Sequence, residues 1–286
     1  MFEVKEIQAK SVLSKTTLKD ADFDYSVNPY YGCRFGCVYC YASFMGRFVG
    51  KNVSDWGNYV FAKINASELL AKEIKSLPDK GRGKVIWFSS VTDPYQGMEA
   101  KYELTRKCLQ VLADYGFAGT VTILTKSDLV LRDVDIFKRF KKFDVGLTIT
   151  STDDKVSRFF EKMAPPVSDR LKALKTLNKL GFKTYAFLGP LLPNILADEK
   201  ELDKLFKSVA DAGTKEIYVE YLNSSNYLIG RLREEIKNLD PELIKLFEKS
   251  KNKEFRKEWD ANINKLVKKY NFHFRFGGTI YHPEMS

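Results

Sequence analysis

The sequence contains little cysteine: there are four cysteines among 286 residues, and three of them fall within eight consecutive positions. A disulfide framework spread along the chain is therefore excluded, and the clustered thiols need a local explanation. No run of 18 or more apolar residues occurs, so no transmembrane helix is expected. The first ten residues, MFEVKEIQAK, carry charges where a signal peptide has an apolar stretch. These features predict a soluble, cytoplasmic protein with no membrane partner.

Acidic residues are fewer than basic ones, 37 against 47, which gives a formal net charge of +10. Such an excess favours contact with polyanions such as nucleic acid. Solvated lysines on helix surfaces produce the same excess without any such partner, so both interpretations stay open. The basic stretch 245–269, which includes Phe255 and Trp259, supports the first of them.

Apolar segments rich in β-branched or aromatic residues alternate with amphipathic segments. The predicted strands are 84–90, 119–125, 143–150, 182–190 and 216–223, with a sixth within 23–31, and the predicted helices are 66–77, 98–115, 133–142, 168–180 and 199–212. Six βα units predict an α/β fold, specifically a partial (β/α)6 TIM-type barrel.

The predicted barrel covers residues 1–225. Residues 226–286 are lysine-rich and mostly helical, and we expect them to form a C-terminal extension packed on the barrel. The final FHFRFGGTIYHP predicts a short strand followed by a lid. No repeat, low-complexity segment or linker marks another domain boundary.

The most informative stretch is NPYYGCRFGCVYCYA, residues 28–42, which places thiols at Cys33, Cys37 and Cys40. Gly32 and Gly36 allow the backbone to turn tightly, so that three thiolates can gather around one object. Thiolates this close together favour a soft metal centre.

Three explanations of the cysteine cluster remain open from the residues alone. A disulfide would leave an odd thiol and is disfavoured in a reducing compartment. Structural zinc needs four ligands, and the other candidates, Cys108, His273 and His282, are distant in sequence. An iron-sulfur cube held by three cysteines leaves one iron open to a cofactor or substrate. The lone Cys108 is expected to be a buried small hydrophobe.

The CxxxCxxC spacing with an aromatic residue, Tyr39, before the last cysteine resembles the radical S-adenosylmethionine (SAM) superfamily. Together with SSVTDPYQ (89–96), residues 28–42 are similar to its spore photoproduct lyase-like branch, also described as DNA repair photolyase-like. The resemblance implies that Cys33, Cys37 and Cys40 hold a [4Fe-4S] cluster whose open iron binds SAM. One electron, from a donor of the flavodoxin or ferredoxin type, then cleaves SAM to a 5′-deoxyadenosyl radical that takes hydrogen from a substrate.

The resemblance also implies contacts to SAM at the carboxyl ends of the strands, where barrel enzymes keep their sites. The implied contacts are Tyr39, Ser90, Thr92, Asp93, Lys126, Thr148, Thr150 and Arg170.

These contacts fall into groups by the part of SAM that they would meet. Tyr39 would lie by the adenine, the loop at 90–93 by the amino group, Lys126 and Arg170 by the carboxylate, and the two threonines by the ribose. Each has an alternative structural role: Asp-Pro is a common turn element, for example, and threonine is a good strand former.

The sequence departs from the family pattern at one informative place. Spore photoproduct lyase returns hydrogen from a cysteine in the loop after its second strand, but residues 88–93 here contain no thiol. A second cysteine cluster, as sulfur-inserting relatives have, is also lacking. Three hypotheses therefore remain: radical chemistry on nucleic acid, the same chemistry on a protein or small metabolite, and a non-catalytic zinc or iron-sulfur module. The sequence identifies no catalytic residue.

Overall fold

The computed structural model describes residues 2–17, 21–192, 195, 198–223, 226–237, 241–249 and 252–282. The chain divides into two compact units, each described by itself below. The N-terminal unit comprises residues 1–36 and 42–146, and the C-terminal unit comprises 37–41 and 147–286. Among the described residues, no helix combines the length and apolar character needed to cross a membrane.

The main sheet of the N-terminal unit is built from parallel strands. β3 (Tyr25–Val27), β6 (Val85–Phe88) and β7 (Thr120–Thr125) are neighbours in that order, and β2 (Leu13–Lys15) pairs antiparallel with β3. β8 (Phe143–Thr148) follows β7 in the sheet. Its first four residues belong to this unit and its last two to the C-terminal unit. Apolar residues occupy most of the core positions of these strands, as expected for parallel strands covered on both faces.

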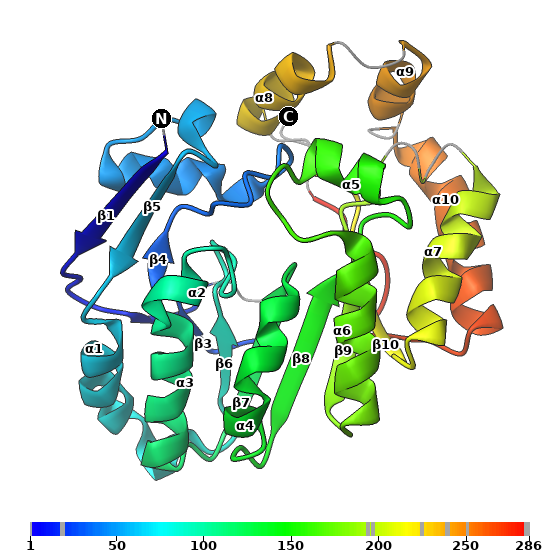
Figure 1. The fold of residues 1–286 in the computed structure, drawn as a ribbon. Coiled ribbons are helices and arrows are strands. Elements are labelled where there is room, and N and C mark those ends of the chain that lie inside the picture. The colour runs from blue at the N-terminus through cyan, green and yellow to red at the C-terminus, as the bar shows by residue number, and fades with distance from the viewer. Residues whose placement is uncertain are drawn as a thin grey trace. The chain divides into compact units, whose positions relative to one another are not determined.

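Helices of the N-terminal unit lie beside one another along this sheet. α1 (Ala66–Glu73) and α3 (Leu104–Tyr115) are in contact over much of their length (Figure 1). The predicted helix 98–115 is in fact two helices, α2 (Glu99–Tyr102) and α3, because Glu103 between them has a left-handed backbone with φ of 52°. The predicted helix 133–142 is only one turn long, α4 (Val134–Phe137).

A second, three-stranded sheet in this unit was not predicted. β1 (Glu3–Ile7) pairs parallel with β5 (Tyr59–Lys63), and β5 pairs antiparallel with β4 (Tyr30–Tyr31). β1 is mostly exposed, so it lacks the apolar alternation that marks a strand in sequence. Short 3-10 helices also occur, namely η1 (Tyr41–Val49), η2 (Val53–Asp55), η3 (Ile74–Ser76), η4 (Pro78–Gly81) and η5 (Asp128–Asp133).

The C-terminal unit continues the βα pattern. After β8 come α5 (Asp154–Phe160), α6 (Val167–Lys179), β9 (Lys183–Leu188), α7 (Glu199–Asp211) and β10 (Glu216–Val219). β9 and β10 pair in parallel, and the sheet order β8-β9-β10 follows the chain. All six predicted strands are therefore confirmed, with shorter bounds, and the predicted α/β class is correct.

The segment after β10 belongs to the C-terminal unit. It contains α8 (Asn226–Ile236), α9 (Pro241–Lys249), α10 (Lys253–Lys269) and β11 (His273–Phe274), and β11 pairs parallel with β10. α10 lies against α7, as Figure 1 shows. The predicted short strand near the end is confirmed. The lid, and a domain boundary between residues 225 and 226, stay predictions.

Candidate functional site

The cysteine loop contains three reduced thiols. None of the four cysteines of the chain forms a disulfide; Cys33 and Cys37 are buried and Cys40 is partly exposed. Cys33 belongs to the N-terminal unit, whereas Cys37 and Cys40 belong to the C-terminal unit. Within the described ranges, no three His, Cys, Asp or Glu side chains are placed to share one metal ion.

Two glycines give the loop its shape. Gly32 and Gly36 have φ of +76° and +60°, the left-handed region that other residues rarely adopt. A Cβ atom at Gly32 would lie 2.5 Å from the carbonyl oxygen of Tyr59, so a larger residue cannot fit without moving the backbone of β5. The glycine requirement that the sequence predicted is confirmed at both positions.

Side chains after β6 are tied to the segment that leads into this loop. The amide of Asn28 donates to the Ser90 hydroxyl (3.3 Å) and accepts from the Val91 backbone N–H (3.2 Å). The Thr92 hydroxyl donates to the carbonyl of Gly32 (2.7 Å). The structure therefore brings the predicted residues Ser90 and Thr92 to the N-terminal part of the cysteine loop, within the same unit.

Asp93 connects the loops after β6 and β7. Its buried carboxylate accepts hydrogen bonds from the Thr125 hydroxyl (2.6 Å) and from the backbone N–H groups of Lys126 (2.8 Å) and Tyr95 (2.9 Å). Burial raises the pKa of Asp93, and these bonds together with the charge of Lys126 oppose the rise. Asp93 thus has the structural turn role considered above, and it also brings the predicted residue Lys126 to the same loop pair.

Ser89, which was not predicted, has two unusual properties. Its φ is +62°, an uncommon value for a residue with a side chain. Its side chain is 6% exposed, and among the residues that the structure describes its hydroxyl oxygen has no hydrogen-bond partner. Buried polar groups are nearly always paired, so a hydroxyl in this state fits a site for an absent polar ligand.

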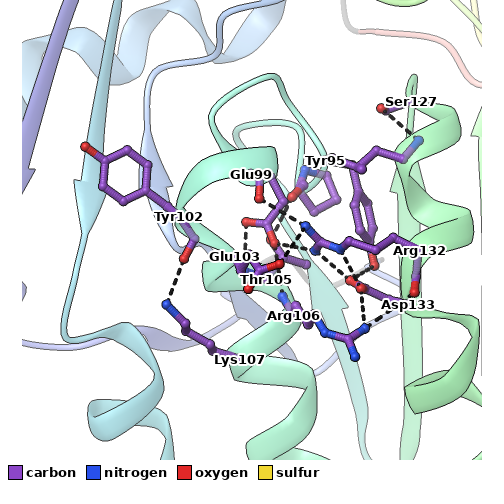
Figure 2. Close-up of polar contacts among 12 residues, drawn as sticks. Tyr95, Glu99, Tyr102, Glu103, Thr105, Arg106, Lys107, Ser127, Arg132 and Asp133 are labelled. Carbon is purple, nitrogen blue, oxygen red and sulfur yellow. Dashed lines mark hydrogen bonds and ion pairs between the residues drawn. The ribbon is translucent and has the colours of Figure 1, made fainter.

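A buried ionic network holds the chain that follows this loop (Figure 2). Glu99 and Asp133 are both fully buried, and Arg132 bridges them with bonds of 2.8 and 2.7 Å. The Tyr95 hydroxyl donates to Asp133 (3.0 Å), and the Tyr30 hydroxyl donates to Glu99 (2.5 Å). The two paired carboxylates therefore hold Tyr30, which precedes the cysteines, and Tyr95, which follows the 89–93 loop. The sequence offered no signal for this network.

Lys63 supports the entry to the cysteine loop from β5. Lys63 as a whole is 6% exposed, and its ammonium group donates to the carbonyl of Asn28 (2.7 Å) and lies 4.3 Å from the ring centroid of Tyr31. Burial lowers the pKa of Lys63 from 10.5 to about 8. In the pH range between these two values the unfolded chain binds the proton and the folded chain releases it.

We therefore expect the stability of the protein to contain a rising contribution from Lys63 between about pH 8 and pH 10.5. The unfolded state binds more protons there, so the free energy of unfolding increases with pH, by up to about 1.4 kcal/mol per pH unit. Denaturant titrations across this range, compared with Lys63→Met, measure the contribution. Equal pH slopes for the two proteins would contradict the assignment.

The C-terminal part of the loop is held by one buried carboxylate. The Tyr39 hydroxyl donates to Glu161, and the Thr150 hydroxyl donates to the same carboxylate oxygen (3.2 Å). The backbone N–H of Val38 also donates to the carbonyl of Phe160 (2.9 Å), the last residue of α5. Burial, together with the Glu161 charge, raises the pKa of Tyr39 well above its ordinary value, so its hydroxyl stays a donor.

Arg170 completes this cluster from α6. Its guanidinium donates to Glu161 (2.5 Å), to the carbonyl of Pro165 through two nitrogens (2.9 and 2.8 Å) and to the carbonyl of Thr148 (3.2 Å). Arg170 and Glu161 are fully buried. An arginine has five N–H groups, and these bonds use four of them. Most of the donors that were predicted to bind the SAM carboxylate are therefore already bonded to protein atoms.

We expect Glu161→Gln to destabilise the folded protein by roughly 3–5 kcal/mol, because the change leaves the Arg170 charge buried without its counter-ion. Denaturant unfolding under anaerobic conditions measures the loss. Asp169→Asn is a matched control. It removes an exposed ion pair with Lys172 on α6, the helix that carries Arg170, and it should lower stability far less. Equal effects of the two substitutions would show that the buried pair has no special role.

The remaining candidates contribute no described site chemistry. Cys108 is fully buried, and burial raises the pKa of its thiol, which confirms the prediction of an inert small hydrophobe. His282 lies 2.9 Å from a Glu220 carboxylate oxygen. Asn194 follows the strand predicted at 182–190 and was expected to face the pocket, but it lies outside the described residues.

Comparison with known proteins now defines the class of this protein. Residues 27–206 match the Radical SAM superfamily, so the chain belongs to this superfamily of enzymes. It is 38% identical over 195 residues to an uncharacterised protein of Methanocaldococcus jannaschii, covering 68% of this chain and 70% of that protein. It is 30% identical over 260 residues to an uncharacterised protein of Acidianus two-tailed virus, covering 84% of each.

Solved structures show the same fold. Spore photoproduct lyase complexed with dinucleoside spore photoproduct aligns with a TM-score of 0.71 at 15% identity, over 97% of this chain and 82% of that chain. A double mutant of the lyase with bound AdoMet (SAM) and the dinucleoside aligns with a TM-score of 0.68 at 15% identity, over 95% and 81%. The partial TIM barrel of the superfamily is therefore the fold of this chain, as predicted.

Proposed function

We propose that this enzyme cleaves SAM reductively at a [4Fe-4S] cluster bound by Cys33, Cys37 and Cys40. The observation that carries the proposal is the CxxxCxxC motif, whose cysteines form no disulfide and lie inside the segment that matches the superfamily. Three thiolate ligands leave the fourth iron open, which is what direct binding of SAM requires. When bound, cluster and SAM supply a 5′-deoxyadenosyl radical that abstracts hydrogen from the substrate.

The residues around the loop fit these groups. Ser89, whose buried hydroxyl has no hydrogen-bond partner among the described residues, belongs to the same short sequence segment as Ser90, Thr92 and Asp93. Hydroxyls and a carboxylate are acceptors, which suits the ammonium group of SAM. Lys126 brings a cation to the same loop pair, which suits a carboxylate. We assign these residues to SAM binding together with Tyr39, Thr148 and Thr150, and we assign Arg170 to it only through the part of its guanidinium that the four bonds described for it do not use.

The test is anaerobic reconstitution followed by reduction in the presence of SAM. We expect a brown protein that contains about four irons and four sulfides and forms 5′-deoxyadenosine. Cys33→Ala, Cys37→Ala and Cys40→Ala should each abolish 5′-deoxyadenosine formation, whereas Cys108→Ala, which removes a buried thiol outside the loop, should retain it. A reconstituted wild-type protein without iron and sulfide, or one that contains zinc instead, would refute the proposal.

We further propose nucleic acid as the first substrate class to examine. The support is the net charge of +10, the lysines of α9 and α10, and the dinucleoside bound by spore photoproduct lyase in the similar structures. Trp259 is buried, so base stacking on that residue is not part of the proposal. The alternative is the same radical chemistry on a protein side chain or small metabolite. Deuterium transfer from labelled candidates into 5′-deoxyadenosine distinguishes the substrate classes.

If α10 contacts phosphates, affinity for DNA or RNA should fall steeply with salt, by a log–log slope of about 0.9 per phosphate neutralised on duplex DNA. The double substitution Lys257→Gln and Lys268→Gln removes two exposed cations of α10 and should reduce that slope by about two units. The control, Lys75→Gln with Lys141→Gln, removes two exposed cations from the N-terminal unit. Equal losses in both double variants, or no binding at physiological salt, would exclude this surface.

The proposed reaction needs one electron of low potential for each cleavage. A flavodoxin or ferredoxin type protein is the class of donor that supplies such electrons, and we propose one as the partner. We also propose a cytoplasmic location, because reduced thiolates and an iron-sulfur cube persist in a reducing compartment.

A further inference from the structure

Three residues on α8 form one face of that helix. Tyr227, Arg231 and Glu235 are spaced four residues apart, so they follow one another along the same side. The Tyr227 hydroxyl donates to the carbonyl of Tyr41 at the end of the cysteine loop (2.8 Å). Glu235 forms an ion pair with Lys162, just after α5 (2.7 Å). All of these residues belong to the C-terminal unit. The Tyr227 end of this face is therefore anchored at the cysteine loop, and the Glu235 end at the residue after Glu161, which itself bonds to Tyr39 of the loop.

Arg231 lies between the two anchors. Its terminal nitrogen Nη1 is shielded from solvent. One helical turn before Arg231, the Tyr227 hydroxyl bonds to the carbonyl of Tyr41, the residue that follows Cys40, so this face of α8 meets the chain beside that cysteine. Consistent with that position, burial lowers the pKa of Arg231 and the charges of Cys40, Cys37 and Glu235 oppose the change. Arginine keeps its proton at any pH at which the protein is folded. The anchored helix therefore presents a permanent positive charge to two of the three proposed cluster ligands.

A charge at this place acts on the reduction of the cluster. Reduction adds one electron to the cube, and a nearby cation stabilises the more negative reduced form over the oxidised form. The interaction is strong where solvent is excluded, because the effective dielectric constant is low. Net charge, hydrogen bonds to sulfur and solvent exposure are the protein features that set the potentials of iron-sulfur clusters.

We propose that Arg231 is a positioning residue that raises the reduction potential of the cluster, so that the protein's electron donor can reduce it. This inference rests on the proposed function, since it requires the cluster on Cys33, Cys37 and Cys40. It goes beyond that function because it assigns a redox role to the C-terminal helical segment. The step transfers one electron from the donor, of flavodoxin or ferredoxin type, to the cluster, with no proton and no bond change.

The test is a redox titration of the reconstituted holoenzyme, followed by the electron paramagnetic resonance signal of the reduced cluster. In Arg231→Gln the ratio of reduced to oxidised cluster at a fixed potential should fall about tenfold, which equals a shift of about 59 mV to lower potential for a one-electron couple. Arg231→Lys keeps the charge and should retain most of the wild-type potential. Arg233→Gln removes an exposed cation two residues further along the same helix and should leave the potential unchanged.

Iron content and circular dichroism of each variant separate a redox effect from misfolding. Arg231→Gln with full iron content and the wild-type potential would overturn the inference. Loss of iron from both the Gln and the Lys variants would also overturn it, by assigning Arg231 to the assembly of the loop. Failure of the proposed function gives a different result, because a wild-type protein without a cluster would show no signal to titrate.

Discussion

The buried carboxylate of Glu161 is the constraint on which the C-terminal part of the cysteine loop depends. Removing a carboxylate from water is costly, and the cost is offset here by a charged hydrogen bond from Arg170 and by the hydroxyls of Tyr39 and Thr150. Tyr39 lies between the last two cysteines of the motif, so this bond fixes the backbone that carries them. The short link between α5 and α6 makes the arrangement possible, because it places the carboxylate and the guanidinium nine residues apart.

The N-terminal unit also contains buried, hydrogen-bonded carboxylates, but they differ in whether an arginine neutralises them. Asp93 is held by a hydroxyl and two backbone N–H groups, with no arginine partner among the residues that the structure describes, and burial raises its pKa. Glu99, deeper in the unit, has Arg132 as its counter-ion. An acceptor such as Asp93, which already receives three donors, keeps about one lone-pair site for a cofactor ammonium. Structural and binding roles are therefore compatible at this residue, and neither excludes the other.

The sequence predicted the parts of this protein that depend on local pattern. Buried parallel strands are continuous apolar runs, and the glycine-flanked cysteines are adjacent in the chain, so both were recognised. Contacts between distant positions were not: the Tyr39–Glu161 bond joins residues 122 positions apart. Nor does any pattern separate Arg231, which faces the loop, from the exposed Arg233 on the same helix. The break at Glu103 was missed because a left-handed backbone is usually recognised in a sequence by glycine, and here the residue is a glutamate.

The four cysteines also limit how the proposed radical reaction can end. Three of them are the proposed cluster ligands, and Cys108 is fully buried with its pKa raised, so no thiol is left to return a hydrogen atom. Tyr30 and Tyr95 are each 1% exposed, with hydroxyls bonded to buried carboxylates, so neither replaces the missing thiol. If the proposed reaction returns a hydrogen atom to its substrate, that atom would come from 5′-deoxyadenosine, which regenerates SAM, or from a donor other than a thiol of this chain, in which case one SAM is consumed per turnover. A shared fold at 15% identity therefore does not by itself carry over the chemistry of spore photoproduct lyase, because a reaction depends on the particular side chains placed on the fold.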